Sequence, residues 1–451
     1  MPTQSFDLIV IGTGSAGKTV AEAAREAGKT VAIVDKQPFG GTCSQRGCDP
    51  KKILVGAAEI VARSSQMTGK GIDSVPAIDW ADLMAFKKTF TDSIPKNTET
   101  KFADEGITSF HGAATFTGTK TVRVGAEELT AKHIVIAAGA RPQPLDIPGE
   151  DLLIDSTDFL SLPALPRKIV LVGGGYIAFE FANIAARAGA SVTIIHRGKR
   201  PLEGFDADVV AFLVKAMEGV GIRFVLDAAV TGVAEKNDVL TVHYRQAGKD
   251  HTMSTNLVVH AAGRVADVAE LALDKAGVDI GKKGITVNKH LQSVSNPAVY
   301  ACGDVADKGL PLTPVAGYEG RVVSENILHG NTQTVDESPV PTTVFTVPPL
   351  ASIGLTEEQA RNEGKDITVL CQETSDWYSS RRINDPVSGF KTIVDRHTGQ
   401  VLGAHLLGTG SEEVINLFAL AMKHGIPAKA LRSTIFAYPT HSSDLSYMLP
   451  E

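Results

Sequence analysis

Two of the four cysteines in this 451-residue chain lie close together, in the segment Gly40-Gly-Thr-Cys43-Ser-Gln-Arg-Gly-Cys48-Asp-Pro-Lys-Lys52. The spacing of Cys43 and Cys48 brackets a turn that leads into a helix, and a thiolate at a helix N-terminus has a lowered pKa. A zinc site needs further thiolate or imidazole ligands nearby, and this segment supplies none. Two cysteines that are buried only for packing are the remaining alternative. The segment therefore favours a redox-active pair over a metal site.

A glycine-rich turn near the N-terminus has the spacing of a dinucleotide-binding site. Gly12-Thr-Gly14-Ser-Ala-Gly17 follows the strand pattern Phe6–Ile11 and opens an alanine-rich helix. Glycines there allow a tight turn and the close approach of a pyrophosphate, which then faces the helix N-terminus. Asp35 ends the next strand, where a carboxylate can accept hydrogen bonds from a ribose diol. A glycine turn with only a structural role is the alternative.

A second turn of this kind is Gly173-Gly-Gly175-Tyr-Ile-Ala178, in which alanine stands at the third glycine position. No acid ends the following strand; instead the chain continues His196-Arg197-Gly-Lys199-Arg200. A carboxylate at this point suits NAD, whereas positive charge suits the 2′-phosphate of NADP. We therefore expect NADPH, with Arg197 as the best phosphate contact. A solvated basic turn beside an NADH site is the alternative.

The elements that position these residues repeat along the chain. Each glycine turn lies between a buried strand and a helix, and a β-branched strand follows, so the chain carries two βαβ dinucleotide folds. A helical stretch is expected over 50–105 and short strands over 106–138. From about Pro341 strands alternate with helices near 356–363 and 411–424, which indicates a separate α+β domain. The predicted class is α/β, with two Rossmann-like domains and a C-terminal α+β domain.

Composition excludes several other kinds of protein. The length is too great for one apolar core, so several domains are expected. A net charge of −7 without a long basic run argues against a nucleic-acid partner. No apolar stretch of about 18 residues is present, which argues against a membrane span. The start of the chain has no signal-peptide pattern and cysteines are few, so we expect a cytoplasmic protein.

These motifs resemble those of the pyridine nucleotide–disulfide oxidoreductases, over essentially the full length of the chain. The resemblance implies that Cys48 is the charge-transfer thiolate beside the flavin of FAD, and that Cys43 is the interchange thiol that attacks the substrate. Lys52 matches the family lysine near the flavin N5, and Glu180 matches its ion-pair partner. Asp304, at the end of the strand pattern Val299-Tyr-Ala-Cys-Gly-Asp304, matches the aspartate that binds the ribityl chain.

The resemblance also implies the cofactors and the assembly. The cofactors are FAD and NADPH, with NADH as the alternative, and no metal is expected. The residues expected to bind the cofactors are Gly12, Gly14, Ser15, Ala16, Gly17, Asp35, Lys36, Gly41, Thr42, Lys52, Ala138, Gly139, Gly173, Gly175, Tyr176, Ile177, Glu180, Arg197, Gly263, Arg264, Gly303, Asp304, Thr313 and Ala316. The expected segments are an FAD domain (1–148), an NAD(P)H domain (149–263), a central FAD segment (264–335) and a dimerisation domain (336–451). The family architecture implies a homodimer with shared active sites, in which Tyr438 and His441 face the partner's Cys43.

The C-terminal acid–base motif departs from the family pattern. The family carries His-Pro-Thr followed by Glu, whereas this chain has Tyr438-Pro-Thr-His441-Ser-Ser443-Asp444. Tyr438 takes the histidine position and Ser443 the glutamate position. A phenol is a poor base at neutral pH but can donate a proton or bind a metal thiolate. His441 and Asp444 form a displaced pair in one interpretation, and His441 is an ordinary helix-start residue in the other.

Three functions follow in order of preference. The first is NAD(P)H-dependent reduction of a small disulfide through the Cys43–Cys48 redox-active centre. The second is reduction of a thiol-bound metal ion, as in mercuric reductases, or of a quinone. The third is a flavin redox sensor with little turnover. Glu22 stands where glutathione reductases carry an arginine for the substrate carboxylate, which argues against ordinary glutathione disulfide.

Overall fold

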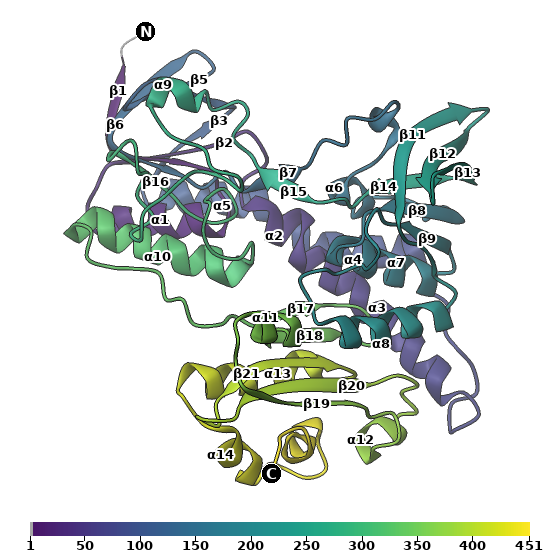
Figure 1. Cartoon of the computed structure of the whole chain (residues 1–451). Helices are drawn as coiled ribbons and strands as arrows, with labels where there is room; N and C mark the ends of the chain where they lie inside the picture. Colours follow the sequence, from purple (N-terminus) through teal and green to yellow (C-terminus); the bar gives the residue numbers. More distant parts are fainter. Residues whose placement is uncertain (1–2) are drawn as a thin grey trace. The chain divides into compact units, whose positions relative to one another are not determined.

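The computed structural model describes residues 3–451 and divides into two compact units (Figure 1). The first unit combines the chain up to Lys51 with Ala85–Pro144 and Gly263–Asp336. The second combines Lys52–Met84, Leu145–Ala262 and Glu337–Glu451. Within residues 3–451, no helix has both the length and the apolar composition needed to cross a bilayer.

The first unit is built on a mixed sheet. Its strand order is β3-β2-β1-β6-β5-β4, with β16 paired to β6, and β1 lies parallel to both β2 and β6. The central strands are apolar on both faces, which is typical of parallel strands covered by helices. The strands of this sheet are β1 (Gln4–Ile11), β2 (Val31–Asp35), β3 (Thr108–His111), β4 (Ala114–Gly118), β5 (Thr121–Val124), β6 (Glu127–Ile136) and β16 (Val299–Ala301); β7 (Ala140–Pro142) and β15 (Arg264–Ala266) form a separate two-stranded sheet.

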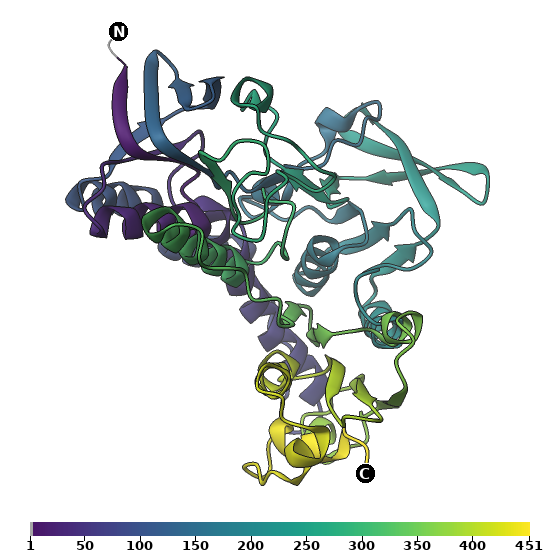
Figure 2. The same cartoon turned by 60° about the vertical axis from the view of Figure 1, so that its left-hand side comes forward.

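Helices α1 and α10 run side by side against this sheet (Figures 1 and 2). They pack closely because a small residue, Gly320, faces Ala16; a Cβ at Gly320 would lie 2.8 Å from the Ala16 carbonyl oxygen. The helices of this unit are α1 (Ser15–Glu26), α2 (Gly41–Arg46), α5 (Ile94–Asp104), α9 (Leu273–Ala276) and α10 (Thr313–His329); α3 (Cys48–Met67) and α4 (Trp80–Thr91) span both units.

The second unit contains a parallel sheet of order β10-β9-β8-β14 and an antiparallel β11-β12-β13 sheet. The helix after β8 is α7, whose inner face is buried from Ala178 to Ala185. This is the second βαβ fold that the sequence predicts. Its elements are α6 (Ser156–Phe159), β8 (Lys168–Val172), α7 (Tyr176–Arg187), β9 (Ser191–Ile195), α8 (Ala207–Gly219), β10 (Arg223–Val225), β11 (Ala228–Lys236), β12 (Val239–Gln246), β13 (Lys249–Thr255) and β14 (Leu257–His260).

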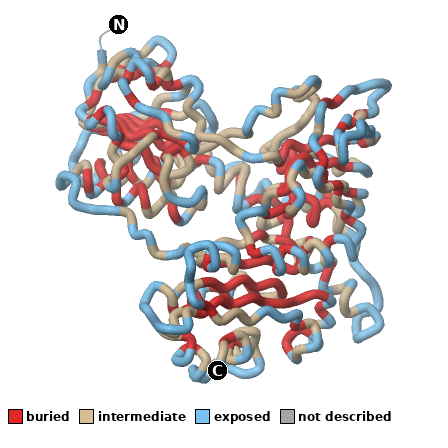
Figure 3. Tube along the Cα trace, viewed as in Figure 1, coloured by how far each residue is buried: buried red, intermediate tan, exposed pale blue. Residues whose placement is uncertain are grey.

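The C-terminal part of the second unit is an antiparallel sheet of order β17-β18-β21-β20-β19 with helices beside it. Figure 3 shows the central strands of this sheet as buried. The elements are β17 (Thr342–Val344), β18 (Leu350–Gly354), α11 (Glu357–Asn362), β19 (Ile367–Glu373), α12 (Tyr378–Arg381), β20 (Gly389–Asp395), β21 (Val401–Leu407), α13 (Ser411–Lys423), α14 (Ala428–Ser433) and a 3₁₀ helix at His441–Tyr447; another 3₁₀ helix, Glu150–Leu152, precedes α6. The predicted α/β class, with two Rossmann-like folds and a separate α+β domain, is confirmed.

Candidate active site

The cysteine pair lies where two helices meet in sequence. Cys43 is part of α2, and Cys48 is the first residue of α3. Both are free thiols in the structure. The Cys48 Sγ lies 3.7 Å from the Thr313 hydroxyl at the start of α10, and the Cys43 thiol donates to Asp49 at 3.9 Å. The structure thus brings Cys48 against Thr313, which the sequence placed near the flavin and the disulfide.

The two sulfurs differ in their electrostatic surroundings. The neighbouring Cys48 and burial both raise the pKa of Cys43 far above its ordinary value. The N-terminus of the 20-residue helix α3 stabilises negative charge on Cys48, because the backbone N–H groups there point toward the first residue. The surroundings therefore favour keeping the proton on Cys43.

The first glycine turn has no space for a side chain at Gly12, and its bare backbone allows a phosphate to approach closely. Gly12 has a φ of +110°, and a Cβ there would lie 2.2 Å from the Ala137 carbonyl oxygen. Helix α1 starts immediately afterwards, at Ser15, so its free N–H groups face the turn. These observations fit the pyrophosphate of a dinucleotide. Ser15, Ala16 and Gly17 all belong to the first turn of this helix.

The segment that carries Cys43 lies against this glycine turn. The Gly40 amide donates to the Thr13 hydroxyl at 3.1 Å. A Cβ at Gly41 would lie 2.3 Å from the Gly14 Cα, so the two backbones are in direct contact. The dinucleotide turn and the segment leading to the cysteines, including Thr42, therefore share one side of the first unit. Thr13 was missed from the sequence because its position in the motif tolerates many residue types.

Asp35 is the last residue of β2, as predicted, and its carboxylate can still accept a hydrogen bond from a ligand. Its Oδ2 accepts from the Thr13 amide at 2.8 Å and from the Thr13 hydroxyl at 2.6 Å, and its Oδ1 accepts from the Gln37 amide at 2.9 Å. A carboxylate has about four lone-pair sites, so a ribose hydroxyl can still donate to it. Lys36 forms ion pairs with Glu270 at 3.0 Å and Asp267 at 3.2 Å, so its ammonium serves the protein itself.

The turn after β16 is held by a glutamate that the sequence analysis did not identify. Burial raises the pKa of Asp304, while the charge of Arg264 lowers it. Glu319 on α10 accepts a hydrogen bond from the Gly303 amide at 2.7 Å, and burial raises the pKa of Glu319 to about 7. Glu319 lies between Val315 and Val322 on the buried side of α10, and only the fold shows that it meets Gly303.

The remaining expected residues of the first unit surround the same turns. Gly139 follows β6, and its carbonyl oxygen accepts from the Asp267 amide at 3.0 Å. Ala138 packs in the core under the sheet, and Ala316 lies 3.4 Å from the Cβ position of Gly303. Arg264 donates to the Ala140 carbonyl oxygen, which fixes its guanidinium between β15 and β7.

The second glycine turn repeats the geometry of the first. Gly173 has a φ of +127°, and a Cβ there would lie 2.1 Å from the Ala261 carbonyl oxygen. Gly175 precedes helix α7, which begins with Tyr176 and Ile177. Ala178, at the third glycine position, is fully buried against the core. Gly263, in the first unit, accepts from the Gln143 amide at 3.1 Å.

The basic loop, residues 196–206, follows β9. Some of its basic side chains form hydrogen bonds within the loop, and others do not form ion pairs within the described residues. The Arg200 guanidinium donates to the Phe205 carbonyl oxygen at 2.9 Å and to the Glu203 carbonyl oxygen at 3.1 Å. The His196 ring is hydrogen-bonded to the Arg200 carbonyl oxygen at 3.2 Å. Within residues 3–451, neither Arg197 nor Lys199 has an ion-pair partner. These two cations are therefore the ones available to a 2′-phosphate.

The expected pairing of Lys52 with Glu180 is not what the structure shows. The Lys52 ammonium lies 3.0 Å from Glu59 and 4.7 Å from the centre of the Phe345 ring. Glu59 is its partner because seven residues are close to two turns of α3, which puts both on one face. Glu180 accepts from the Phe345 amide at 2.9 Å. The adjacent Lys51 is only 8% exposed, whereas the Lys52 side chain is 43% exposed.

The C-terminal motif exposes Tyr438 and leaves His441 half-buried. Tyr438 is 80% exposed. Burial lowers the pKa of His441, with Arg382 and Arg63 adding to the effect and Asp444 opposing it. Ser443 forms a capping box with Thr440 at the start of the 3₁₀ helix, which gives it a local structural role. His441 and Asp444 are thus close enough to influence each other, as the three-residue spacing predicts.

The structure offers no cluster for a bound metal ion. Across residues 3–451, no three His, Cys, Asp or Glu side chains are arranged to hold one. The sites described above consist of backbone turns, thiols and cations, which are suited to dinucleotides and sulfur chemistry.

Comparison with protein-family models gives two matches that together span most of the chain. Residues 6–320 match the family described as pyridine nucleotide-disulphide oxidoreductase. Residues 340–448 match the dimerisation domain of the same family.

Individual proteins show the same relationship. The chain is 32% identical to a glutathione reductase of Burkholderia cepacia over 441 residues, which cover 98% of this chain and 97% of that protein. It is 31% identical to a mercuric reductase of Lysinibacillus sphaericus over 446 residues, which cover 98% of this chain and 81% of that protein. Among solved structures, the Cu(II) complex of the HOCl-induced flavoprotein disulfide reductase RclA from Escherichia coli superposes with a TM-score of 0.88 at 30% identity, covering 99% of each chain.

Proposed function

Because this chain belongs to the pyridine nucleotide-disulphide oxidoreductase family, we propose that it is an FAD-dependent NADPH:disulfide oxidoreductase acting on a small disulfide. The observation that carries the proposal is the cysteine pair. Cys48 starts a long helix next to the Thr313 hydroxyl, and the segment before Cys43 packs on the first glycine turn. A dinucleotide site and a dithiol are thereby joined within one unit.

The residues around the first glycine turn would hold the FAD. Gly12 and Gly14 admit the pyrophosphate, Asp35 accepts from the ribose, and Asp304 accepts from the ribityl chain. When bound, FAD supplies the ability to take a hydride from a nicotinamide and pass an electron pair to a disulfide. Lys51 is the better buried of the two adjacent lysines, so we assign it, in place of Lys52, to the flavin side of α3.

The cysteines divide the sulfur chemistry between them. After the Cys43–Cys48 disulfide has taken up two electrons, Cys43 loses its proton and attacks one sulfur of the substrate, which releases the first product thiolate. The Cys48 thiolate then attacks the Cys43 sulfur, releases the second thiol and closes the disulfide again. The charge of Cys48 keeps Cys43 protonated until a base removes that proton.

The proton steps belong to the C-terminal motif. A lowered pKa keeps His441 neutral at pH 7, which is the form that can accept a proton. Tyr438 can donate a proton to a departing thiolate from its exposed position. We propose that both act on the partner's Cys43 across a homodimer, for which the dimerisation domain is the structural basis.

The coenzyme assignment to NADPH depends on the basic loop. Arg197 and Lys199 are the cations with no partner inside the described part of the chain, and no carboxylate ends β9. NADH is the alternative. We also propose the division into an FAD domain (1–148 and 264–335), an NADPH domain (149–263) and a dimerisation domain (336–451), in a cytoplasmic protein.

Reduction of a thiol-bound metal ion is the second candidate. Tyr438 replaces the usual histidine, and a phenol is no handicap when the acceptor is a metal ion that needs no proton. The chain also resembles a mercuric reductase, and the RclA structure is a Cu(II) complex.

An acceptor panel under anaerobic conditions separates these functions. NADPH consumption is followed with glutathione disulfide, small aryl disulfides, Hg(II), Cu(II) and quinones. We expect the fastest turnover with a small disulfide and its loss in Cys43→Ser. Faster turnover with Hg(II) or Cu(II) favours the second candidate, and negligible turnover with every acceptor leaves a redox sensor.

A further inference from the structure

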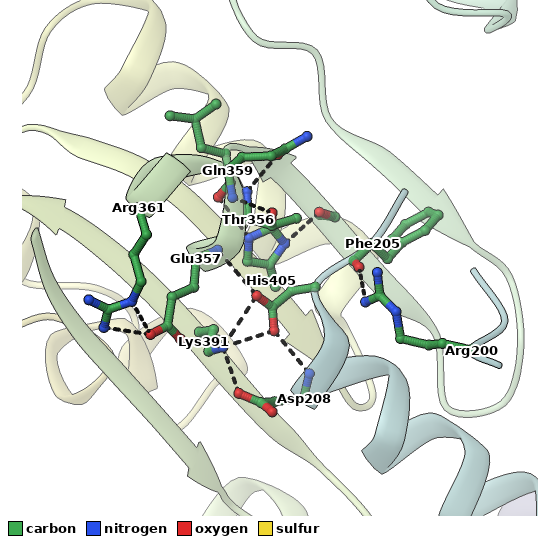
Figure 4. Close-up of polar contacts among 12 residues, drawn as sticks. Arg200, Phe205, Asp208, Thr356, Glu357, Gln359, Arg361, Lys391 and His405 are labelled. Carbon is green, nitrogen blue, oxygen red and sulfur yellow. Dashed lines mark hydrogen bonds and ion pairs between the residues drawn. The ribbon is translucent and has the colours of Figure 1, made fainter. Parts of the chain in front are cut away.

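A buried lysine joins the C-terminal sheet to the helix that follows the basic loop. Lys391 lies on β20, and its ammonium is surrounded by three carboxylates (Figure 4). The distances are 3.1 Å to Asp206, 2.6 Å to Asp208 and 2.7 Å to Glu357. Asp206 and Asp208 belong to the start of α8, whereas Glu357 begins α11.

Lys391 remains charged in this position. Burial opposes the charge, but the three carboxylates outweigh it and raise the pKa of Lys391 above its ordinary value. The lysine side chain is 4% exposed and Asp206 is 3% exposed, so salt and water screen this contact weakly. Arg361 pairs with Glu357 at 2.7 Å and compensates part of the excess negative charge.

Asp206 transmits this contact to the basic loop. It is the N-cap of α8, accepting from the Asp208 amide at 3.1 Å, and it is also the last residue of the loop. Four residues earlier, the Leu202 amide donates to the Gly174 carbonyl oxygen at 2.8 Å, within the second glycine turn. Arg200 closes the loop internally through the Phe205 and Glu203 carbonyl oxygens.

The geometry points to Lys391 as a positioning residue for coenzyme binding. It holds Asp206, and through Asp206 the loop that presents Arg197 and Lys199 to the 2′-phosphate, although Lys391 itself contacts no coenzyme. The C-terminal sheet thereby sets the affinity for NADPH. This inference rests on the proposed use of NADPH, but the mobility of the basic loop tests it independently of the coenzyme.

The chain provides a matched control on the same helix. Lys215 lies on α8 and pairs with Glu373 of β19 at 3.2 Å, so it also links the helix to the C-terminal sheet. Its side chain is 63% exposed. Surface ion pairs of this kind contribute little, so Lys215→Met should leave the loop unchanged.

Two variants remove the buried contact in different ways. Lys391→Met leaves three carboxylates without their cation, which can impair folding. Asp206→Asn removes only one charge and keeps an N-cap oxygen, so it retains the fold. Hydrogen exchange of residues 198–208 is measured in the FAD-loaded enzyme without coenzyme, and the dissociation constants of NADPH and NADH are measured in the same preparations.

We expect faster exchange in residues 198–208 for Asp206→Asn and Lys391→Met, and a rise of about 5–10-fold in the ratio of the NADPH to the NADH dissociation constant. Lys215→Met should match the wild type in both. Unchanged exchange in Asp206→Asn overturns the inference whichever coenzyme is used. Faster exchange with an unchanged ratio, in an enzyme whose wild type prefers NADPH, also overturns it. A wild type without NADPH preference contradicts the proposed coenzyme, and the exchange result then decides the role of Lys391.

Discussion

At the scale of single residues, the candidate site works by separating charges that would otherwise compete. Cys48 and burial together raise the pKa of Cys43 far above its ordinary value, so that Cys43 keeps its proton. The Asp304 and Glu319 carboxylates lie close together, and Glu319 accepts a hydrogen bond from the Gly303 amide. Small displacements of such groups change which protonation state is stable. Substitutions of single residues therefore have clear expected effects.

Arg197→Glu should weaken NADPH far more than NADH, because only NADPH has the 2′-phosphate. Loss of one charge-assisted contact and the added repulsion should cost about 1–3 kcal/mol, or roughly 5–150-fold in the NADPH dissociation constant. Arg245→Glu, on the β11-β12-β13 sheet, is the matched control, since its partner is the exposed Asp250. Equal effects of Arg197→Glu on both coenzymes would remove the basis for assigning NADPH.

Glu319→Gln should make stability less sensitive to pH. The folded pKa of Glu319 is about 7 against an ordinary value of 4.5, so the folded protein holds this proton more tightly than the unfolded chain. The resulting stabilisation is complete below the unfolded pKa and is lost as the pH rises through the folded pKa. Glutamine can still accept the hydrogen bond from the Gly303 amide, but it does not titrate. Between low and high pH, the free energy of unfolding of the variant should therefore rise by about 2–3 kcal/mol relative to that of the wild type.

The measurement is the free energy of unfolding across that pH range, by urea titration. Glu325→Gln on the same helix is the control, because Glu325 is exposed and pairs only with His329. A wild type and a Glu319→Gln variant with parallel pH profiles would show that Glu319 is an ordinary carboxylate.

At the scale of elements, each dinucleotide turn depends on one glycine whose Cβ position is occupied by backbone. Gly12→Ala should prevent FAD binding, since its methyl group would overlap the Ala137 carbonyl oxygen. Gly56→Ala in α3 meets nothing within 4 Å, and it should keep FAD and stabilise the helix by up to about 1 kcal/mol. FAD content after purification is the readout. A yellow Gly12→Ala protein with full FAD content would contradict the role of this turn.

Elements were predictable where the pattern is local. The strand ending at Asp35, the helix starting at Cys48 and the two βαβ folds all follow from short sequence patterns. Strand ends are less predictable: β17 ends at Val344, and shortly afterwards the Thr346 hydroxyl donates to the Pro348 carbonyl oxygen. Propensity alone does not identify a single helical turn such as α12.

Contacts between distant segments were not predictable from the sequence. Glu319 meets Gly303, and Lys391 meets Asp206, only after the sheets have formed. The partner of Lys52 was misjudged for a related reason: the resemblance indicated Glu180, but the local geometry of α3 selects Glu59. A single sequence carries the pattern of a fold more clearly than the pairing of its charged side chains.

At the scale of the whole molecule, the match of residues 340–448 to the family's dimerisation domain supports the proposed homodimer. Ile435 is 97% exposed and Tyr438 is 80% exposed, which is unusual for large apolar side chains on a free surface. Both lie in the segment that the family architecture places at the partner subunit. The proposed homodimer would cover both side chains.

Co-expression of two impaired variants tests this arrangement. Cys43→Ser loses disulfide turnover, and Tyr438→Ala should lower it. In a heterodimer of the two, one of the two sites has both wild-type residues, so we expect up to about half of the wild-type activity per dimer, measured after separation by two affinity tags. Heterodimers that are no more active than the parent homodimers would place both residues in one subunit.

Anaerobic titration of the FAD-loaded enzyme with NADPH tests the central claim most directly. The account predicts a long-wavelength absorbance from a Cys48 thiolate beside the flavin in the two-electron-reduced enzyme. The band should persist in Cys43→Ser and vanish in Cys48→Ser. A band that survives Cys48→Ser, or a purified protein that is colourless and takes up no added FAD, would contradict it.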